Sequence, residues 1–229
     1  MELFSATKNN NKPLIRQIID LVPKDIINNL VSQYQSNKGC SKYKVYDQFV
    51  AMIFGQLNKS ITLSDISTGI SGTFIKDLCL EQSLARSTMS DGNKKRNYQV
   101  YEALYYQTLR HYEKILSKAH KKIIIEELKN KTIKIIDSTI ISVCLSMFNW
   151  AKYWTAKGGI KIHTCWDDTL MIPDIVNISE AKVHDIKGFE NLVFPKETII
   201  VEDRAYFDFT LMLSRICRLN HSLGQAKMR

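Results

Sequence analysis

The chain has 229 residues, of which 45% are hydrophobic and 24% are charged, and its formal net charge is +9. This length and composition favour one large globular domain or two modest ones, and no apolar run approaches the roughly 20 residues of a membrane span. The sequence also opens without a basic and hydrophobic signal segment, so a cytoplasmic protein with no membrane partner is expected.

The cysteines argue against two kinds of cross-linked fold. Five of them are scattered along the chain, and none forms a CxxC pair, which disfavours both a disulfide framework and a zinc ribbon.

The basic balance favours a polyanionic partner, of which nucleic acid is the usual one. Residues 91–134 hold eleven Lys or Arg against five Asp or Glu, so this segment carries +6 of the +9. The alternative is that these charges form only the solvated face of a helix.

The first half of the chain has the apolar spacing of helices. Apolar residues recur three and four positions apart in residues 12–22, 23–34, 44–57 and 97–130. Residues 1–128 are therefore expected to form an all-α domain, and residues 129–229 a second domain.

A helix-turn-helix is predicted between Ser60 and Arg96. Ser60 or Thr62 can cap a short helix, and Ser87 or Thr88 can cap a second one, with a Gly-containing break between them.

The second of these helices has the composition of a DNA recognition helix. Hydroxyl and basic groups at its start can reach base edges and phosphates, and a basic run follows at its end. The alternative is a linker between two bundle helices that is capped for ordinary reasons. The residues expected to contact DNA are Arg86, Ser87, Thr88, Lys94, Lys95 and Arg96.

From residue 131 the apolar period changes from 3.6 to 2, which predicts strands. The order of three strands, a helix and a further strand favours a mixed sheet whose first and fourth strands are parallel neighbours. Strands are predicted at 131–143, 158–166, 169–179 and 197–203, and helices at 184–193 and 207–216.

An aspartate interrupts the first predicted strand. Alternation places Asp137 with Ile133, Ile135 and Ile141 on the more apolar face. A lone carboxylate there costs free energy unless it is paired, hydrogen-bonded or bound to a metal. A strand-end aspartate that caps a nearby turn is the simpler alternative.

A second aspartate, Asp203, lies at the carboxyl end of the fourth predicted strand. Ligand-binding groups collect at the carboxyl ends of strands, so Asp137 and Asp203 converge if these strands are adjacent. Two carboxylates repel each other unless a cation lies between them, and hard oxygen ligands suit Mg²⁺ or Mn²⁺. The alternative for Asp203 is the N-cap of a following helix.

Four stretches, "IIDSTIISV", "GGIKIHTCWD", "SEAKVHD" and "VEDRAYFDF", occur in this order and resemble the catalytic region of insertion-sequence DDE transposases, specifically the IS-four group. "SITLSDISTGI" and "RSTMSDGNKKR" resemble parts of the helical domain that precedes this region in one branch of the group. The resemblance implies an α+β chain, with an all-α DNA-binding N-terminal domain and a ribonuclease-H-like mixed α/β catalytic domain.

By this resemblance Asp137 and Asp203 are the first two acids of the DDE triad, and Mg²⁺ (or Mn²⁺) is the cofactor. The implied function is two-metal cutting of phosphodiesters at transposon ends and transfer of the 3′-hydroxyl to target DNA. The implied partner is double-stranded DNA, at the transposon ends and the target, and a homodimer stays an open option.

The family's third acid is a glutamate in a tyrosine, arginine, glutamate, lysine signature, and the residues after Leu213 contain no counterpart to it. A catalytic domain truncated at its C-terminus is therefore expected, and the 229 residues should bind DNA without cutting it. A catalytically dead remnant that only binds DNA is the alternative function. A helical transcription regulator with a degenerate appended domain is a third.

Other residues near these motifs have weaker signals. Lys161 and His163 are expected to face opposite sides of their strand, with His163 in a structural role. Tyr206 is expected beside the site, and the sequence assigns no role to Asp185.

Overall fold

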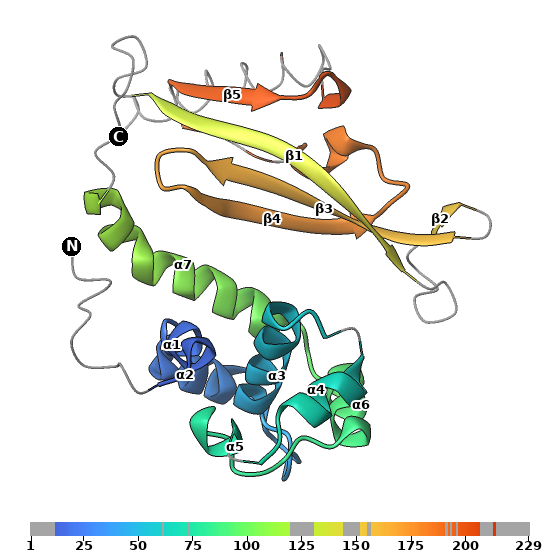
Figure 1. The fold of residues 1–229 in the computed structure, drawn as a ribbon. Coiled ribbons are helices and arrows are strands. Elements are labelled where there is room, and N and C mark those ends of the chain that lie inside the picture. The colour runs from blue at the N-terminus through green and yellow to red at the C-terminus, as the bar shows by residue number, and fades with distance from the viewer. Residues whose placement is uncertain are drawn as a thin grey trace. The chain divides into compact units, whose positions relative to one another are not determined.

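The computed structural model describes residues 12–60, 62–72, 74–119, 131–143, 152–154, 157–190, 192, 194–195, 197–206 and 213. The chain divides into two compact units, Met1–Tyr112 and Glu113–Arg229. The first is helical and the second is built on a sheet, so the expected α+β class is confirmed (Figure 1).

The helical unit forms around one apolar core, to which α3 contributes most. Val45, Val50 and Ala51 of this helix are at most 2% exposed. The predicted helices all occur, although residues 120–130 of the last one lie outside the described part of the chain. The helices are α1 (Leu14–Asp20), α2 (Lys24–Tyr34), α3 (Val45–Leu57), α4 (Leu63–Gly69), α5 (Phe74–Asp77), α6 (Arg86–Lys95) and α7 (Gln99–Ala119).

The short helix α4 begins with a capping box. The backbone N–H of Asp65 donates to Thr62 Oγ1 at 3.2 Å, and the Thr62 N–H donates to Asp65 Oδ2 at 2.8 Å. Of the two predicted caps, Thr62 is therefore the one used, and each residue satisfies an N–H that the helix leaves free.

The predicted caps of α6 are wrong. The helix begins at Arg86, its N-cap is Ala85, and no side chain caps it. Leu84 and Met89 are both buried, and they occupy the two positions of a hydrophobic staple around this N-terminus. Burial of apolar residues thus stabilises the start of the helix, and Ser87 and Thr88 lie within its first turn.

The second unit contains the four predicted strands and one short strand, β2, that the sequence did not predict. The predicted helix 184–193 forms only a 3₁₀-helix, and the predicted helix 207–216 lies outside the described residues except for 213. The strands are β1 (Thr132–Val143), β2 (Lys152–Trp154), β3 (Lys157–Asp167), β4 (Ile172–Glu180) and β5 (Thr198–Glu202), and the 3₁₀-helices are η2 (Asp185–Phe189) and η3 (Arg204–Tyr206).

The strands form one mixed sheet with the predicted topology. β1 pairs antiparallel with β3, and β3 pairs antiparallel with β4 and β2. β5 returns to the other edge of β1 and pairs with it in parallel (Figure 1). β1, β3 and β4 form the meander, and the crossover is the segment between β4 and β5, which leads back to the strand parallel with β1. This arrangement is consistent with a ribonuclease-H-like domain.

The buried face of β1 is not the face that the apolar pattern predicted, which carries Asp137. Ile136 is 2% exposed and packs in a small core with Phe189, Phe194 and Tyr206. Ile135, on the other face, is 37% exposed. The apolar pattern of β1 does not distinguish its faces, because isoleucines occupy both; the crossover residues decide which face is buried.

The prediction that Lys161 and His163 face opposite sides of β3 is also wrong. They are two residues apart on one strand and therefore share a face. Both are buried, at 7% and 0% exposure, on the face that carries Ile136 and Ser138 of β1.

Candidate active site and DNA interface

The two candidate catalytic aspartates follow neighbouring positions of two parallel strands. The parallel pairing of β1 with β5 ends at Ile136 and Glu202, so Asp137 and Asp203 are the next residues on the two strands. Both side chains are exposed. Asp137 Oδ1 accepts the backbone N–H of Ser138 at 2.8 Å, which fixes the direction of that carboxylate.

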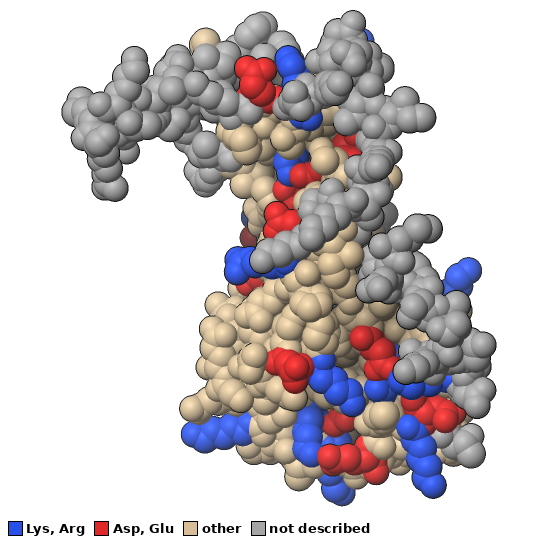
Figure 2. Space-filling view, turned by 90° about the vertical axis from the view of Figure 1, so that its left-hand side faces the viewer, with Lys and Arg blue, Asp and Glu red and all other residues tan. Residues whose placement is uncertain are grey.

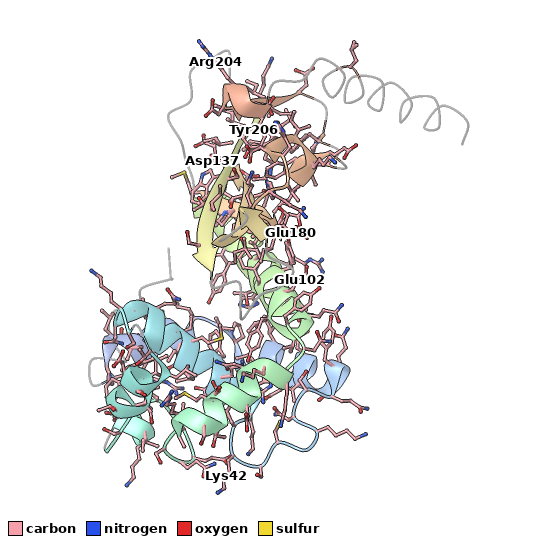
Figure 3. The ribbon with its side chains drawn as sticks, turned by 90° about the vertical axis from the view of Figure 1, so that its right-hand side faces the viewer. Lys42, Glu102, Asp137, Glu180, Arg204 and Tyr206 are labelled. Carbon is pink, nitrogen blue, oxygen red and sulfur yellow. The ribbon has the colours of Figure 1, made fainter. Side chains whose placement is uncertain are left out.

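Tyr206 lies beside these carboxylates. Its N–H donates to the carbonyl of Asp203 at 3.0 Å, and its ring packs against Phe189. Burial raises the pKa of Tyr206, and the negative charges of Asp185, Asp137 and Asp203 raise it further, so the phenol lies within electrostatic reach of all three. Figure 3 shows Asp137 and Tyr206 in the same part of this unit.

The Tyr206 hydroxyl has no hydrogen-bond partner among the described residues, although its ring is almost fully buried. Ser138 is close enough to lower the pKa of the phenol, but the Ser138 hydroxyl gives its proton to Asp185. The Ser138 oxygen can still accept the phenol proton, so Tyr206 belongs to the buried polar cluster of Ser138 and Asp185.

A chain of polar contacts supports Asp137 from the covered side of the sheet. Ser138 Oγ donates to Asp185 Oδ1 at 2.7 Å, and Lys161 Nζ lies 3.0 Å from the same oxygen. Lys161 also donates to the carbonyl of Val183 at 2.8 Å. Burial alone would raise the pKa of Asp185, but the hydrogen bonds from Ser138 and Lys161 hold it below its ordinary value. The crossover is thus tied to β1 and β3.

His163 fills the space between the sheet and η2. Its Nε2 lies 2.9 Å from Ser179 Oγ, and its ring meets Phe189 edge to face. A Cβ on Gly188 would lie 2.2 Å from His163 Nδ1, so only glycine lets η2 approach the imidazole this closely. These contacts favour a structural role for His163.

Acidification is expected to destabilise the second unit through His163. Burial and the neighbouring Lys161 lower its pKa, with a smaller opposing effect of Asp185. Below pH about 6.5 the unfolded chain therefore binds a proton that the native state excludes, so the free energy of unfolding decreases as pH falls from 7.5 to 5.5. Urea unfolding at both pH values tests this. His163→Gln should weaken the pH dependence, and His184→Gln should keep it.

Asp137 and Asp203 can supply some, but not all, of the ligands that a divalent metal ion needs. Exposed carboxylate oxygens suit Mg²⁺ or Mn²⁺, which take water and phosphate oxygens for their remaining positions. Within the described ranges, no group of three or more His, Cys, Asp or Glu side chains is placed to hold one ion. Asp137 and Asp203 would thus supply two protein ligands.

Some of the residues expected to contact DNA lie on the surface of the helical unit, and others are partly buried in it. Arg86, Ser87, Lys94 and Lys95 are exposed, and Thr88 is half-buried. Ser87 and Lys94 are seven positions apart and share one side of the helix, and Arg86 and Lys95 flank that side. Figure 2 shows basic and acidic side chains interspersed on one face of the helical unit.

Arg96 binds within the helical unit instead of extending into solvent. Its guanidinium donates to the carbonyls of Tyr43 and Lys44 and to Gln48 Oε1, and it lies 5.5 Å from the centre of the Tyr43 ring. These contacts favour a role in holding the residue 40–44 segment against α6. Sequence reasoning missed this role because the partners lie about 50 residues away.

Comparison with known proteins identifies two segments of the chain. Residues 10–74 match "Domain of unknown function (DUF4372)", and residues 128–217 match "Transposase DDE domain". A protein of Geobacillus stearothermophilus described as "Probable transposase for insertion sequence element IS5377" is 32% identical over 78 residues, which cover 34% of this chain and 20% of that relative. No solved structure matches the chain.

The DDE match includes β1, β5 and both aspartates. In the described part of the chain, no helix is both long and apolar enough to cross a membrane. A DUF4372 segment before a DDE domain, together with this similar protein, supports an insertion-sequence DDE transposase.

Proposed function

We propose that the chain supplies two catalytic carboxylates, Asp137 and Asp203, to a transposase that cuts phosphodiesters at the ends of an insertion sequence and transfers the 3′-hydroxyl to target DNA. The observation that carries the proposal is the placement of these aspartates directly after the last residue pair that joins β1 to β5, inside the segment that matches the DDE domain. The DDE family uses divalent metal ions, and two adjacent carboxylates need such a charge.

In this proposal Asp137 and Asp203 hold Mg²⁺ or Mn²⁺, which when bound would activate the attacking oxygen and stabilise the leaving oxygen. The Ser138 N–H orients the Asp137 carboxylate. The contact of Ser138 with Asp185 holds β1 against the crossover.

The helical unit is proposed to bind the DNA duplex through the exposed side of α6. Arg86, Ser87, Lys94 and Lys95 supply the cations and hydroxyls that bind phosphates and base edges. Because Arg96 is bound inside the unit, it is proposed to position α6 and not to contact DNA directly.

The function is tested by adding the glutamate-bearing region of the family to the 229 residues. Both chains are mixed with one labelled duplex that carries the element's ends, with Mg²⁺ or Mn²⁺. We expect both chains to bind the duplex and only the extended chain to nick it. Nicking by the 229-residue chain would show that two acids suffice, and an extended chain that binds but never nicks would contradict the proposed reaction.

A smaller loss of nicking activity is expected when the hydrogen bond between Ser138, the neighbour of Asp137, and Asp185 is removed. In the extended chain, Ser138→Ala removes the hydrogen bond to Asp185 and should reduce the nicking rate about 10- to 100-fold, as is typical of groups that orient metal ligands. DNA affinity should not change. Ser142→Ala, at an exposed position on the same strand, is the matched control and should nick at the parent rate. Equal losses in both variants would exclude a specific role for Ser138.

A further inference from the structure

A pocket of about 370 Å³ lies in the helical unit between α6 and the loop that joins α2 to α3. The loop contributes residues 38–43, and the helix contributes Thr88, Asp91, Gly92 and Lys95. None of the loop residues was expected to contact DNA, because they precede the helix-turn-helix segment, which begins at Ser60, by 17 to 22 residues.

The loop is fixed against the helix by contacts that leave little freedom. A Cβ on Gly92 would lie 2.4 Å from the Tyr43 ring, so the missing side chain lets Tyr43 lie directly on α6. The Tyr43 hydroxyl donates to Asn93 Oδ1 at 3.3 Å, and Arg96 donates to the carbonyls of Tyr43 and Lys44. The shape of the pocket is therefore set by the folded unit.

The pocket collects positive charge that no neighbouring carboxylate neutralises by direct pairing. Lys38, Lys42 and Lys95 are exposed, and no ion pair forms at any of the three within the described residues. Lys44, by contrast, lies 2.9 Å from Glu81. Asp91 is the one acidic residue of the lining. Figure 3 shows Lys42 at the edge of the helical unit.

The lining offers donors for one class of ligand. Three ammonium groups and the hydroxyls of Ser41 and Thr88 can donate hydrogen bonds, and a phosphodiester presents anionic oxygens that only accept them. A helix that lays its exposed side on a duplex also needs a phosphate contact beside it to fix its register.

We propose that this pocket binds a backbone phosphate of duplex DNA, so that Lys38 and Lys42 belong to the DNA interface together with α6. The inference rests on the proposed DNA binding by the helical unit. The loop lysines contact the phosphate from one side and Lys95 from the other, while Ser87 and Lys94 remain free to face the duplex.

The test measures how salt weakens binding of the full 229-residue chain to a fluorescent duplex of random sequence. The pocket variant Lys38→Gln/Lys42→Gln is compared with Lys59→Gln/Lys76→Gln, which removes the same charge at exposed positions outside the pocket. Each lost phosphate contact lowers the slope of log affinity against log salt by about 0.9. We expect a decrease of about 0.9 in the pocket variant and no change in the control variant.

A second comparison removes a negative charge from the pocket, which should strengthen DNA binding instead of weakening it. Asp91→Asn removes the carboxylate from the pocket and should raise DNA affinity several-fold, whereas Asp77→Asn, at an exposed position on α5, should leave it unchanged. Circular dichroism of each variant checks that the helical unit is folded.

The outcomes separate this inference from the proposed function. A parent chain that binds DNA with the same salt slope as the pocket variant overturns the phosphate pocket and leaves DNA binding to another surface. A parent chain that does not bind duplex DNA overturns both proposals. A lower slope in the pocket variant alone, with tighter binding by Asp91→Asn, supports the pocket.

Discussion

Asp137→Asn and Asp203→Asn are each expected to reduce metal-dependent nicking by about 10³-fold or more, which corresponds to about 4 kcal/mol of transition-state stabilisation. The measurement uses the chain extended by the family's glutamate-bearing region, with Mg²⁺ or Mn²⁺ and one labelled end-containing duplex. The reason is electrostatic: an amide keeps the shape of the carboxylate but loses the charge that would hold the ion. DNA affinity should change little, because both aspartates lie outside the helical unit.

Glu202→Gln is the matched control for these two variants. Glu202 precedes Asp203 and is paired with Ile136, so it lies on the covered face of the sheet and not with Asp137. It should retain most of the nicking rate. If Glu202→Gln loses as much activity as Asp203→Asn, then the catalytic carboxylate at the end of β5 has been assigned to the wrong residue.

The largest expected effect on stability concerns Lys134, which is buried between two aspartates. Lys134 Nζ lies 2.6 Å from Asp167 Oδ2 and also contacts Asp174, and the Lys134 side chain is only 9% exposed. Lys134→Met leaves two carboxylates together without their cation, which should lower the free energy of unfolding by about 3 to 5 kcal/mol. All three tryptophans lie in residues 113–229, so their fluorescence during urea unfolding reports on this unit.

The effect of Lys134→Met should depend on pH in a defined direction. Burial alone would raise the pKa of Asp167, but Lys134 and the N–H groups of Leu170 and Thr169 hold it below its ordinary value. This stabilisation is complete above pH about 4 and is lost as pH falls through the lower, native pKa. The difference between parent and variant should therefore shrink on acidification.

A triple variant isolates the charge effect in this network. Lys134→Met with Asp167→Asn and Asp174→Asn removes all three charges, and it should be more stable than Lys134→Met alone. Asp167 Oδ1 also accepts the N–H groups of Thr169 and Leu170, and an asparagine can keep these bonds. No recovery in the triple variant would mean that packing, and not charge, explains the loss.

The strand order was predictable because each strand carries its own local pattern. The change to a period of two locates β1, β3, β4 and β5, and the crossover rule places β5 beside β1. β2 has three residues, too few for any period to be visible. The covered face of β1 was not predictable from β1 alone, since Ile135 and Ile136 are equally apolar and Phe189 and Tyr206 decide between them.

The candidate site shows the same division between local and long-range information. Asp137 and Asp203 could be proposed from their places on two strands that the topology brings together. The link from Ser138 through Asp185 to Lys161 could not, because it joins three segments whose side chains meet only after the crossover has folded. In the helical unit, the partners of Arg96 are distant in sequence for the same reason.

The parallel pairing of β1 with β5 sets the order in which the second unit can fold. β1, β3 and β4 are joined by antiparallel pairings between successive long strands, whereas Thr132 meets Thr198 only after the whole meander and crossover have been synthesised. Closing that long loop costs more conformational entropy and slows the step. Asp203 therefore reaches Asp137 late, and a chain still emerging from the ribosome carries the first aspartate without the second.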